Sequence, residues 1–200
     1  GKLNDSVTGN VRVLAEKSFE LRSQAQAEAI FSILLPLGKP VEVKTNQLLF
    51  EMESIDLNRS LRRVLMSKNA HQKRLDVGSE IAVQLEVEEK DLNGVKELST
   101  ESGGVALLDL EKKENYVLRL RKQLENERIA NYETSEILNL EVERLNEELK
   151  KRKILSPIDG TLVSSNVKPG GMVFSGQVLG KLISHGRVIE VSLNEENFAG

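Results

Sequence analysis

Few side chains in this 200-residue sequence are placed to perform catalytic or metal chemistry. It contains two histidines, His71 and His185, which are far apart in the chain, and no cysteine. Neither histidine has a second histidine or a glutamate at the spacing of a metal-ligand motif. Without cysteine the chain has no thiol nucleophile, no disulfide and no cysteine-based zinc site. We therefore expect no enzymatic activity, no metal site and no cofactor.

The charged residues do not indicate a phosphate or nucleic-acid site either. Pro169-Gly170-Gly171 lacks the Lys-Ser or Lys-Thr of a phosphate-binding loop, so we interpret it as a turn. The basic run Lys150-Lys151-Arg152-Lys153 has no aromatic residue among its members that could stack on a base. The chain has 28 Lys and Arg and 31 Asp and Glu, a net charge of −3, which does not favour a nucleic-acid partner.

A middle segment, residues 54–153, has the pattern of two long helices. Leu, Val or Ile recurs at every third or fourth position among charged residues. Its most turn-like stretch, Ser99-Thr100-Glu101-Ser102-Gly103-Gly104, lies near its midpoint. We predict an antiparallel hairpin with its tip there and arms of about 45 residues, roughly 68 Å long. Two other interpretations stay open: a tip at 91–94, where Asn93-Gly94 has turn chemistry, and a strand at 81–87, where apolar residues alternate.

The apolar residues of both arms share a seven-residue phase, which is the spacing of a coiled-coil seam. Asn131 interrupts this phase in the second arm, and Lys68, His71 and Gly78 interrupt it in the first. We interpret His71 as a polar residue that sets the register of the arms or is partly exposed. The predicted seam consists of Leu57, Leu61, Val64, Leu85, Leu110, Val117, Leu124, Leu138 and Leu145.

The segments on either side of the hairpin contain short strands and turns, and they repeat one another imperfectly. The spacing of Val173, Gln177, Leu179 and Leu182 is repeated by Val43, Gln47, Leu49 and Met52. In this alignment Glu28 stands where the second copy has Gly160. One copy has too few strands to bury a core. We predict that the two copies form one sandwich, with residues 53 and 154 as neighbours.

Turn residues support this repeat. Gly170, Gly171 and Gly176 allow the positive φ of tight turns, and Asn46 can take the place of a glycine in that conformation.

Residues 154–184 resemble the second lipoyl half-motif of the membrane fusion proteins, which are the HlyD-like periplasmic adaptors. The matching stretches are Ser156-Pro157-Ile158-Asp159-Gly160-Thr161-Leu162, Lys168-Pro169-Gly170-Gly171-Met172-Val173 and Gly176-Gln177-Val178-Leu179. Residues 30–52 resemble a degenerate first half-motif. Residues 187–198 resemble the strand and acidic turn with which an adjacent β-barrel domain resumes.

The resemblance implies an α+β fold in which a long antiparallel coiled-coil hairpin is inserted into a split lipoyl-like β-sandwich, next to part of a β-barrel domain. It divides the chain into a partial barrel (1–22 and 185–200), a lipoyl-like domain (23–53 and 154–184) and the hairpin (54–153). The lipoyl-motif residues with structural roles would be Gly38, Asn46, Pro157, Asp159, Gly160, Gly170, Gly171 and Gly176.

The resemblance also implies a function. The protein would be a periplasmic adaptor that links an inner-membrane transporter, either ABC-type or proton-driven, to an outer-membrane exit duct for secretion or efflux. Several copies would form a ring, with a hexamer as one option, and the hairpin tip at 99–104 would contact the duct. The chain would be an excised soluble fragment, anchored in the full protein by an N-terminal segment absent here. The duct-contacting tip signature of the family (Arg, Leu four residues on, Ser or Thr seven beyond) does not occur in the sequence.

Two alternatives remain at this level. The protein could be a structural coiled-coil interaction protein with no role in transport. It could also be a lipoyl or biotinyl carrier, but a carrier needs a lysine on the turn that joins its two halves. The corresponding stretch here is Glu51-Met52-Glu53-Ser54, which offers no attachment point for a swinging arm.

Overall fold

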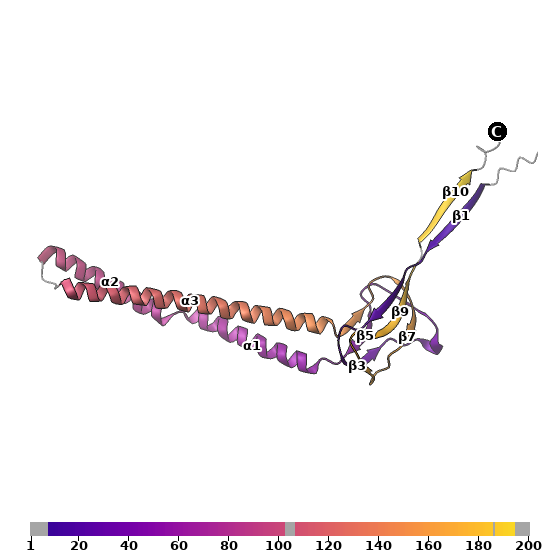
Figure 1. Ribbon diagram of the computed structural model, residues 1–200, viewed down its shortest axis with the longest axis horizontal. Coiled ribbons are helices and arrows are strands. Elements are labelled where there is room, and N and C mark those ends of the chain that lie inside the picture. The colour runs from indigo at the N-terminus through magenta and orange to yellow at the C-terminus, as the bar shows by residue number, and fades with distance from the viewer. Residues whose placement is uncertain (1–7, 103–106, 186, 195–200) are drawn as a thin grey trace, which may run out of the picture. The chain divides into compact units, whose positions relative to one another are not determined.

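The structure is a computed structural model that describes residues 8–102, 107–185 and 187–194 (Figure 1). The chain divides into two units, Asp56–Asn146 and the combination of Gly1–Ile55 with Glu147–Gly200. The helices are α1 (Ile55–Val77), α2 (Glu80–Ser102), α3 (Leu107–Lys150) and the short 3-10 helix η1 (Pro36–Gly38). The strands are β1 (Thr8–Ala15), β2 (Ser18–Arg22), β3 (Ala27–Ser32), β4 (Val41–Val43), β5 (Leu48–Met52), β6 (Lys153–Leu155), β7 (Gly160–Ser165), β8 (Met172–Val173), β9 (Val178–Ser184) and β10 (Arg187–Asn194).

The helical unit is the predicted antiparallel hairpin, but its first arm is two helices and not one. Gly78, at φ +90°, ends α1, and its N–H donates to the carbonyl of Leu75 at 3.1 Å. Ser79 then starts α2, because its hydroxyl oxygen accepts the N–H of Ala82 at 3.2 Å as an N-cap does. The second arm is continuous over the 44 residues of α3.

Both alternatives for residues 81–94 are wrong. Residues 81–87 and Asn93-Gly94 lie inside α2, whose buried residues Leu85 and Leu92 are seven positions apart. Burial at helical spacing, together with the helix-forming Glu, Gln and Lys around it, outweighs both the short alternation and the turn dipeptide.

The other unit contains a β-sandwich of two antiparallel four-stranded sheets. Their orders are β2-β9-β7-β4 and β6-β5-β3-β8. Each sheet takes two strands from before the hairpin and two from after it, so neither half can form a sheet of this kind alone. The base of the hairpin closes as predicted, because Glu51 pairs with Lys153 and Phe50 pairs with Ile154.

The two sheets have the same strand order once β2 is matched with β6, β9 with β5, β7 with β3 and β4 with β8. This correspondence confirms an internal repeat and corrects one detail of it. Gly160 pairs with Val43, and the equivalent pairing joins Val173 to Ala27, so the counterpart of Gly160 is the buried Ala27 and not Glu28. Strand β2, which ends at residue 22, pairs with β9 and so belongs to one of the two sheets.

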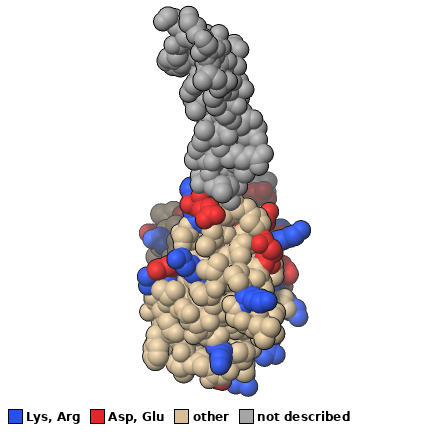
Figure 2. Space-filling model, turned by 90° about the vertical axis from the view of Figure 1, so that its right-hand side faces the viewer, with Lys and Arg blue, Asp and Glu red and all other residues tan. Residues whose placement is uncertain are grey.

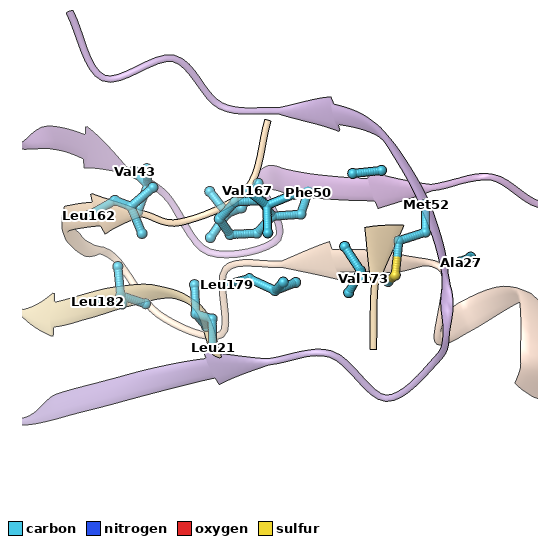
Figure 3. Close-up of a cluster of buried hydrophobic side chains, with 12 residues drawn as sticks. Leu21, Ala27, Val43, Phe50, Met52, Leu162, Val167, Val173, Leu179 and Leu182 are labelled. Atoms are coloured by element: carbon cyan, nitrogen blue, oxygen red, sulfur yellow. The ribbon is translucent and has the colours of Figure 1, made fainter. Parts of the chain in front are cut away.

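The core of the sandwich lies between these sheets (Figure 3). The repeated apolar positions Val43, Leu49, Met52, Val173, Leu179 and Leu182 are all at most 2% exposed. Phe50, at 1%, fills the centre alongside them. The apolar residues that repeat in the sequence are therefore the residues that form the core of the sandwich.

Strands β1 and β10 form a separate two-stranded antiparallel ribbon, with Thr8 opposite Asn194 and Ala15 opposite Arg187.

Among the described helices, none combines the length and apolar character that crossing a bilayer requires.

Candidate functional site

The two halves of the sandwich are joined by a pair of equivalent backbone hydrogen bonds that the sequence pattern did not predict. The N–H of Asn46 donates to the carbonyl of Ser156, and the N–H of Gly176 donates to the carbonyl of Ser23, each at 2.7 Å. Both serines are buried, and each hydroxyl donates at 2.7 Å to the carbonyl two residues ahead. Each turn is thus bonded to the other half of the chain, across the hairpin insertion.

The turns themselves are built alike in the two halves. The side-chain oxygen of Gln47 accepts the N–H of Lys44, and that of Gln177 accepts the N–H of Phe174, each at 3.0 Å. Asn46 at φ +66° and Gly176 at φ +84° occupy the same turn position, which requires a left-handed backbone. Because Gln47 and Gln177 each close the same turn, they occupy the same position in the two copies of the repeat.

The other lipoyl-motif residues have distinct positions. Gly170 has the predicted positive φ of +92°, and Gly38 has one of +69°, whereas Gly171 has an ordinary φ. Gly160 is needed for space, since a Cβ there would lie 2.4 Å from the carbonyl oxygen of Ile183. Pro157 is exposed on the loop between β6 and β7.

Asp159 links the two halves through its carboxylate. Its Oδ1 accepts the backbone N–H of Thr45 at 2.8 Å and the hydroxyl of Thr45 at 3.0 Å. These hydrogen bonds lower the pKa of Asp159 below its ordinary value, with a smaller contribution from the nearby Lys44. Glu42 has a lowered pKa for a similar reason, because Thr161 donates to it and His185 contacts it.

The predicted seam residues are all buried or half-buried. Leu85, Val117, Leu124 and Leu145 are buried, with Leu145 at 1% exposure. The half-buried members are Leu57, Leu61, Val64, Leu110 and Leu138. Leu92 and Leu120 are also buried, and they complete the cluster between α2 and α3.

Ion pairs border this cluster on the outer half of the hairpin. Arg121 pairs with Glu89 at 2.9 Å, Lys96 with Glu114 at 3.6 Å, and Lys113 with Asp91. Each pair joins α2 to α3 across a narrow apolar strip, as the flanking charges of a coiled coil do. All are solvent-exposed, so their main effect is to fix partner and register, with little contribution to stability.

The polar interruptions of the two seams meet. His71 is 6% exposed, and its Nε2 lies 3.1 Å from the carbonyl oxygen of Asn131 and 3.0 Å from the hydroxyl of Ser135. The interruption in α1 is therefore satisfied by α3, through the backbone carbonyl of Asn131 and the side chain of Ser135. A buried polar contact of this kind favours one alignment of the two helices.

The predicted tip residues lie at the end of α2. Ser99, Thr100, Glu101 and Ser102 belong to its last turns, and the hydroxyl of Ser99 donates to the carbonyl of Lys96 at 2.9 Å. Gly103 and Gly104 lie outside the described residues.

Within the described part of the chain, no three His, Asp or Glu side chains gather where a metal ion could be held. Figure 2 shows one face of the sandwich, on which charged residues of both signs are scattered around an uncharged area. The described residues thus offer a long helical hairpin and a β-sandwich built from both ends of the chain.

The sequence matches no protein-family model, and no curated protein resembles it significantly. Solved structures do resemble it. MacA from Actinobacillus actinomycetemcomitans is 19% identical, with a TM-score of 0.61 over 92% of this chain and 54% of MacA. A MacA–MexA chimeric protein with the α-hairpin domain of Pseudomonas aeruginosa MexA is 16% identical, with a TM-score of 0.48 over 90% of this chain and 55% of its own. The membrane fusion protein Spr0693 from Streptococcus pneumoniae R6 is 12% identical, with a TM-score of 0.46 over 95% and 71%.

The assignment of the fold rests on MacA, whose TM-score exceeds 0.5. The chain shares the fold of MacA. It spans about half the length of the MacA structure and of the chimeric protein.

Proposed function

We propose that this chain is the hairpin-bearing part of a periplasmic adaptor that joins an inner-membrane transporter to an outer-membrane exit duct. The observation that carries the proposal is the interlocked sandwich, from which a hairpin leaves at Met52 and to which it returns at Lys153. This is the arrangement of the membrane fusion protein fold. An adaptor needs length and surfaces that bind partners, and the long hairpin supports the first of these requirements.

The reach of the hairpin fits that role. The 44 residues of α3 correspond to about 66 Å at 1.5 Å per residue. The seam, the interhelical ion pairs and the contact between His71 and Asn131 keep the two arms aligned over this length. Such a rod bridges a gap between two partners without any chemistry of its own.

We assign the parts of the adaptor as follows. Residues 18–53 and 154–184 form the lipoyl-like body, residues 54–153 form the hairpin, and the β1–β10 ribbon belongs to the adjacent barrel domain. The end of the hairpin near residues 99–104 contacts the exit duct, the barrel side faces the transporter, and several copies surround the exported cargo. In this arrangement the full protein is periplasmic and anchored in the inner membrane.

The test is export in cells that carry variants of the seam. Leu124→Asp and Leu145→Asp each place a carboxylate at a buried position between the arms, which destabilises the hairpin. We expect each substitution to abolish export while transporter abundance stays unchanged. Leu65→Asp is the matched control, because Leu65 on α1 is 45% exposed, and this variant should export normally.

Normal export by both seam variants would contradict the proposal. A structural coiled-coil protein with no transport role predicts a different result in a second measurement. Affinity purification of the full protein should recover an inner-membrane transporter, whereas such a coiled-coil protein would recover none.

A further inference from the structure

A cavity of about 630 Å³ lies between the two arms of the hairpin, at the break in the first arm. It is lined by the end of α1, by Gly78 and Ser79 between the helices, by the start of α2 and by residues 124–131 of α3. Cavities of roughly 300–1,000 Å³ are of the size that binds small molecules in proteins. All of the lining residues belong to the helical unit, so the hairpin alone forms the cavity.

A missing side chain in the seam of the first arm creates this cavity. Gly78 has the same seven-residue phase as His71 and Leu85, which are 6% and 9% exposed. Apart from its two chain neighbours, a Cβ at Gly78 would meet no atom within 4 Å, so this position of the seam is open space. In a close-packed coiled coil each such position is filled by a side chain.

The seam residues next to Gly78 leave the gap uncovered. Leu75 at the end of α1 is 37% exposed, and Ala82 in α2 is small and half-buried. Leu124 of α3 also lines the cavity; it is 8% exposed and belongs to the apolar cluster between α2 and α3. The apolar walls of the cavity therefore lack some of the contacts of a packed seam, and an apolar molecule of matching size would supply them.

The charged side chains around the cavity favour a negatively charged ligand. They are Lys73, Arg74, Glu80, Glu127 and Arg128. Arg74 lies in the last turn of α1 and Glu80 in the first turn of α2, so each is opposite in charge to the helix end that it occupies. This leaves Lys73 and Arg128 against Glu127, and none of these three has an ion-pair partner among the described residues.

We propose that the cavity binds a small amphiphilic anion, namely a free molecule with an apolar body and one carboxylate or phosphate head group. The apolar body occupies the space at Gly78 and contacts Leu124, and the head group binds Arg128 and Lys73. Arginine suits this role because its guanidinium donates two parallel hydrogen bonds to a carboxylate or a phosphate. The site does not depend on the proposed adaptor role, because every one of its residues lies in the hairpin.

A molecule in the cavity would contact α1, α2 and α3 at once. It would thereby hold the broken arm against the continuous one, because opening of either helix end would release the bound molecule. We expect amide hydrogen exchange of residues 74–82 to slow when the ligand binds, while exchange in the sandwich stays the same.

The binding test compares three probes that share one alkyl tail and differ in the charge of the head group. Decanoate is the anion, decanol is neutral and decyltrimethylammonium is the cation, and each is kept below the concentration at which it forms micelles or separates. Calorimetry with the whole chain should show one decanoate bound per chain, with several-fold weaker binding of decanol and still weaker binding of the cation. Decanoate should change the amide NMR shifts of Gly78, Ser79 and Asn131 most strongly.

One substitution tests the cavity itself. Ala82→Leu fills the cavity with a side chain that is compatible with a helix, so decanoate should bind roughly tenfold more weakly or not at all. Ala70→Leu makes the same change at an exposed position of α1 outside the cavity. It is the matched control and should bind decanoate as the unsubstituted chain does.

A second pair of variants tests the head-group site. Arg128→Gln with Lys73→Gln should weaken the binding of decanoate several-fold and leave the binding of decanol unchanged. Arg119→Gln with Lys122→Gln removes the same charges from α3 outside the cavity and should change neither. All four positions are exposed, so the fold is retained, and circular dichroism checks this.

The proposal is overturned if decanoate does not bind, if the three probes bind equally well, or if the cation binds most tightly. Decanoate binding that Ala82→Leu leaves intact would overturn it as well. Vesicles of phosphatidylglycerol distinguish a free ligand from a lipid in a bilayer, and the chain should not sediment with them. Sedimentation with the vesicles that Ala82→Leu abolishes would assign the cavity to a membrane lipid and contradict the free ligand.

Discussion

Two buried serines, Ser23 and Ser156, each connect the halves of the sandwich through two backbone hydrogen bonds, because the N–H of Ser23 also donates to the carbonyl of Gln177 and that of Ser156 to the carbonyl of Gln47, each at 2.9 Å. Each has its hydroxyl satisfied by a carbonyl two residues ahead and its carbonyl satisfied by the turn of the opposite half. A signal for them exists in the sequence, since Leu21-x-Ser23-x-Ala25 and Ile154-x-Ser156-x-Ile158 share one pattern. It is weak because serine is usually exposed, and only the backbone pairing shows why these two are buried.

Two glycines of this fold differ in whether a larger residue fits at their position. Alanine substitutions at the two positions should therefore change stability in opposite directions. Gly160→Ala should destabilise the sandwich by about 1–3 kcal/mol, because the new Cβ meets the backbone carbonyl oxygen of Ile183. Gly94→Ala should stabilise the hairpin by about 1 kcal/mol, because Gly94 is inside α2 with open space around it. Amide hydrogen exchange in β7 and α2 measures the two effects separately. Equal stability of Gly160→Ala and the unsubstituted chain would contradict the close packing of β7 on β9.

The hydrogen bonds to Asp159 predict a pH dependence. The pKa of this carboxyl is lowered in the folded state, so its contribution to stability is complete above its ordinary value of 3.8. That contribution is lost as the pH falls from 3.8 through the lower folded value. Asp159→Asn removes the titrating group, so the variant should lose less stability than the unsubstituted chain over this acid range.

Urea midpoints measured at a series of acid pH values check the prediction for Asp159. Glu111→Gln, at an exposed position of α3, is the matched control and should leave the acid dependence unchanged. If Asp159→Asn and the unsubstituted chain lost stability in parallel, the carboxylate would not be bonded to Thr45.

At the scale of elements, the hairpin and its seam follow from the sequence because burial at a seven-residue period is a local pattern. The break at Gly78 is visible only as an irregularity, since a glycine in a helical pattern is compatible with either a continuous helix or an end.

The break between α1 and α2 depends on its caps. Ser79→Ala removes the side-chain acceptor for the N–H of Ala82 and should destabilise the first arm by about 1 kcal/mol. Ser67→Ala, at an exposed position inside α1, is the control and should be neutral or slightly stabilising, because alanine is the better helix former. Helix melting followed at 222 nm checks both. An unchanged melting temperature for Ser79→Ala would show that the cap contributes nothing.

At the scale of the whole molecule, the sequence predicted which segments come together but not how their strands interlock. The repeat of Val43 to Met52 and Val173 to Leu182 identifies two halves of one body. It does not reveal that each sheet is shared, because strand exchange is decided by hydrogen bonds between residues more than 100 positions apart. For the same reason the pairing of β2 with β9 could not be predicted, since β2 has neither the glycines nor the spacing of the repeat.

Each sheet takes strands from both sides of the hairpin in the chain. We therefore expect the sandwich to fold when the hairpin is removed, but not when the chain before or after the hairpin is missing. Replacing residues 56–146 with a short glycine-containing loop should preserve the sandwich, because Glu51 and Lys153 are paired and the N–H of Met52 donates to the carbonyl of Arg152 at 2.7 Å. A short loop also closes at a lower entropic cost than a long flexible one. By contrast, a chain that ends at residue 152 lacks β6, β7, β8 and β9, and its remaining strands cannot rebuild either sheet. Dispersed amide NMR signals for the first chain and collapsed signals for the second would agree with this. A folded sandwich in the truncated chain would mean that the halves are independent, which would contradict the shared sheets.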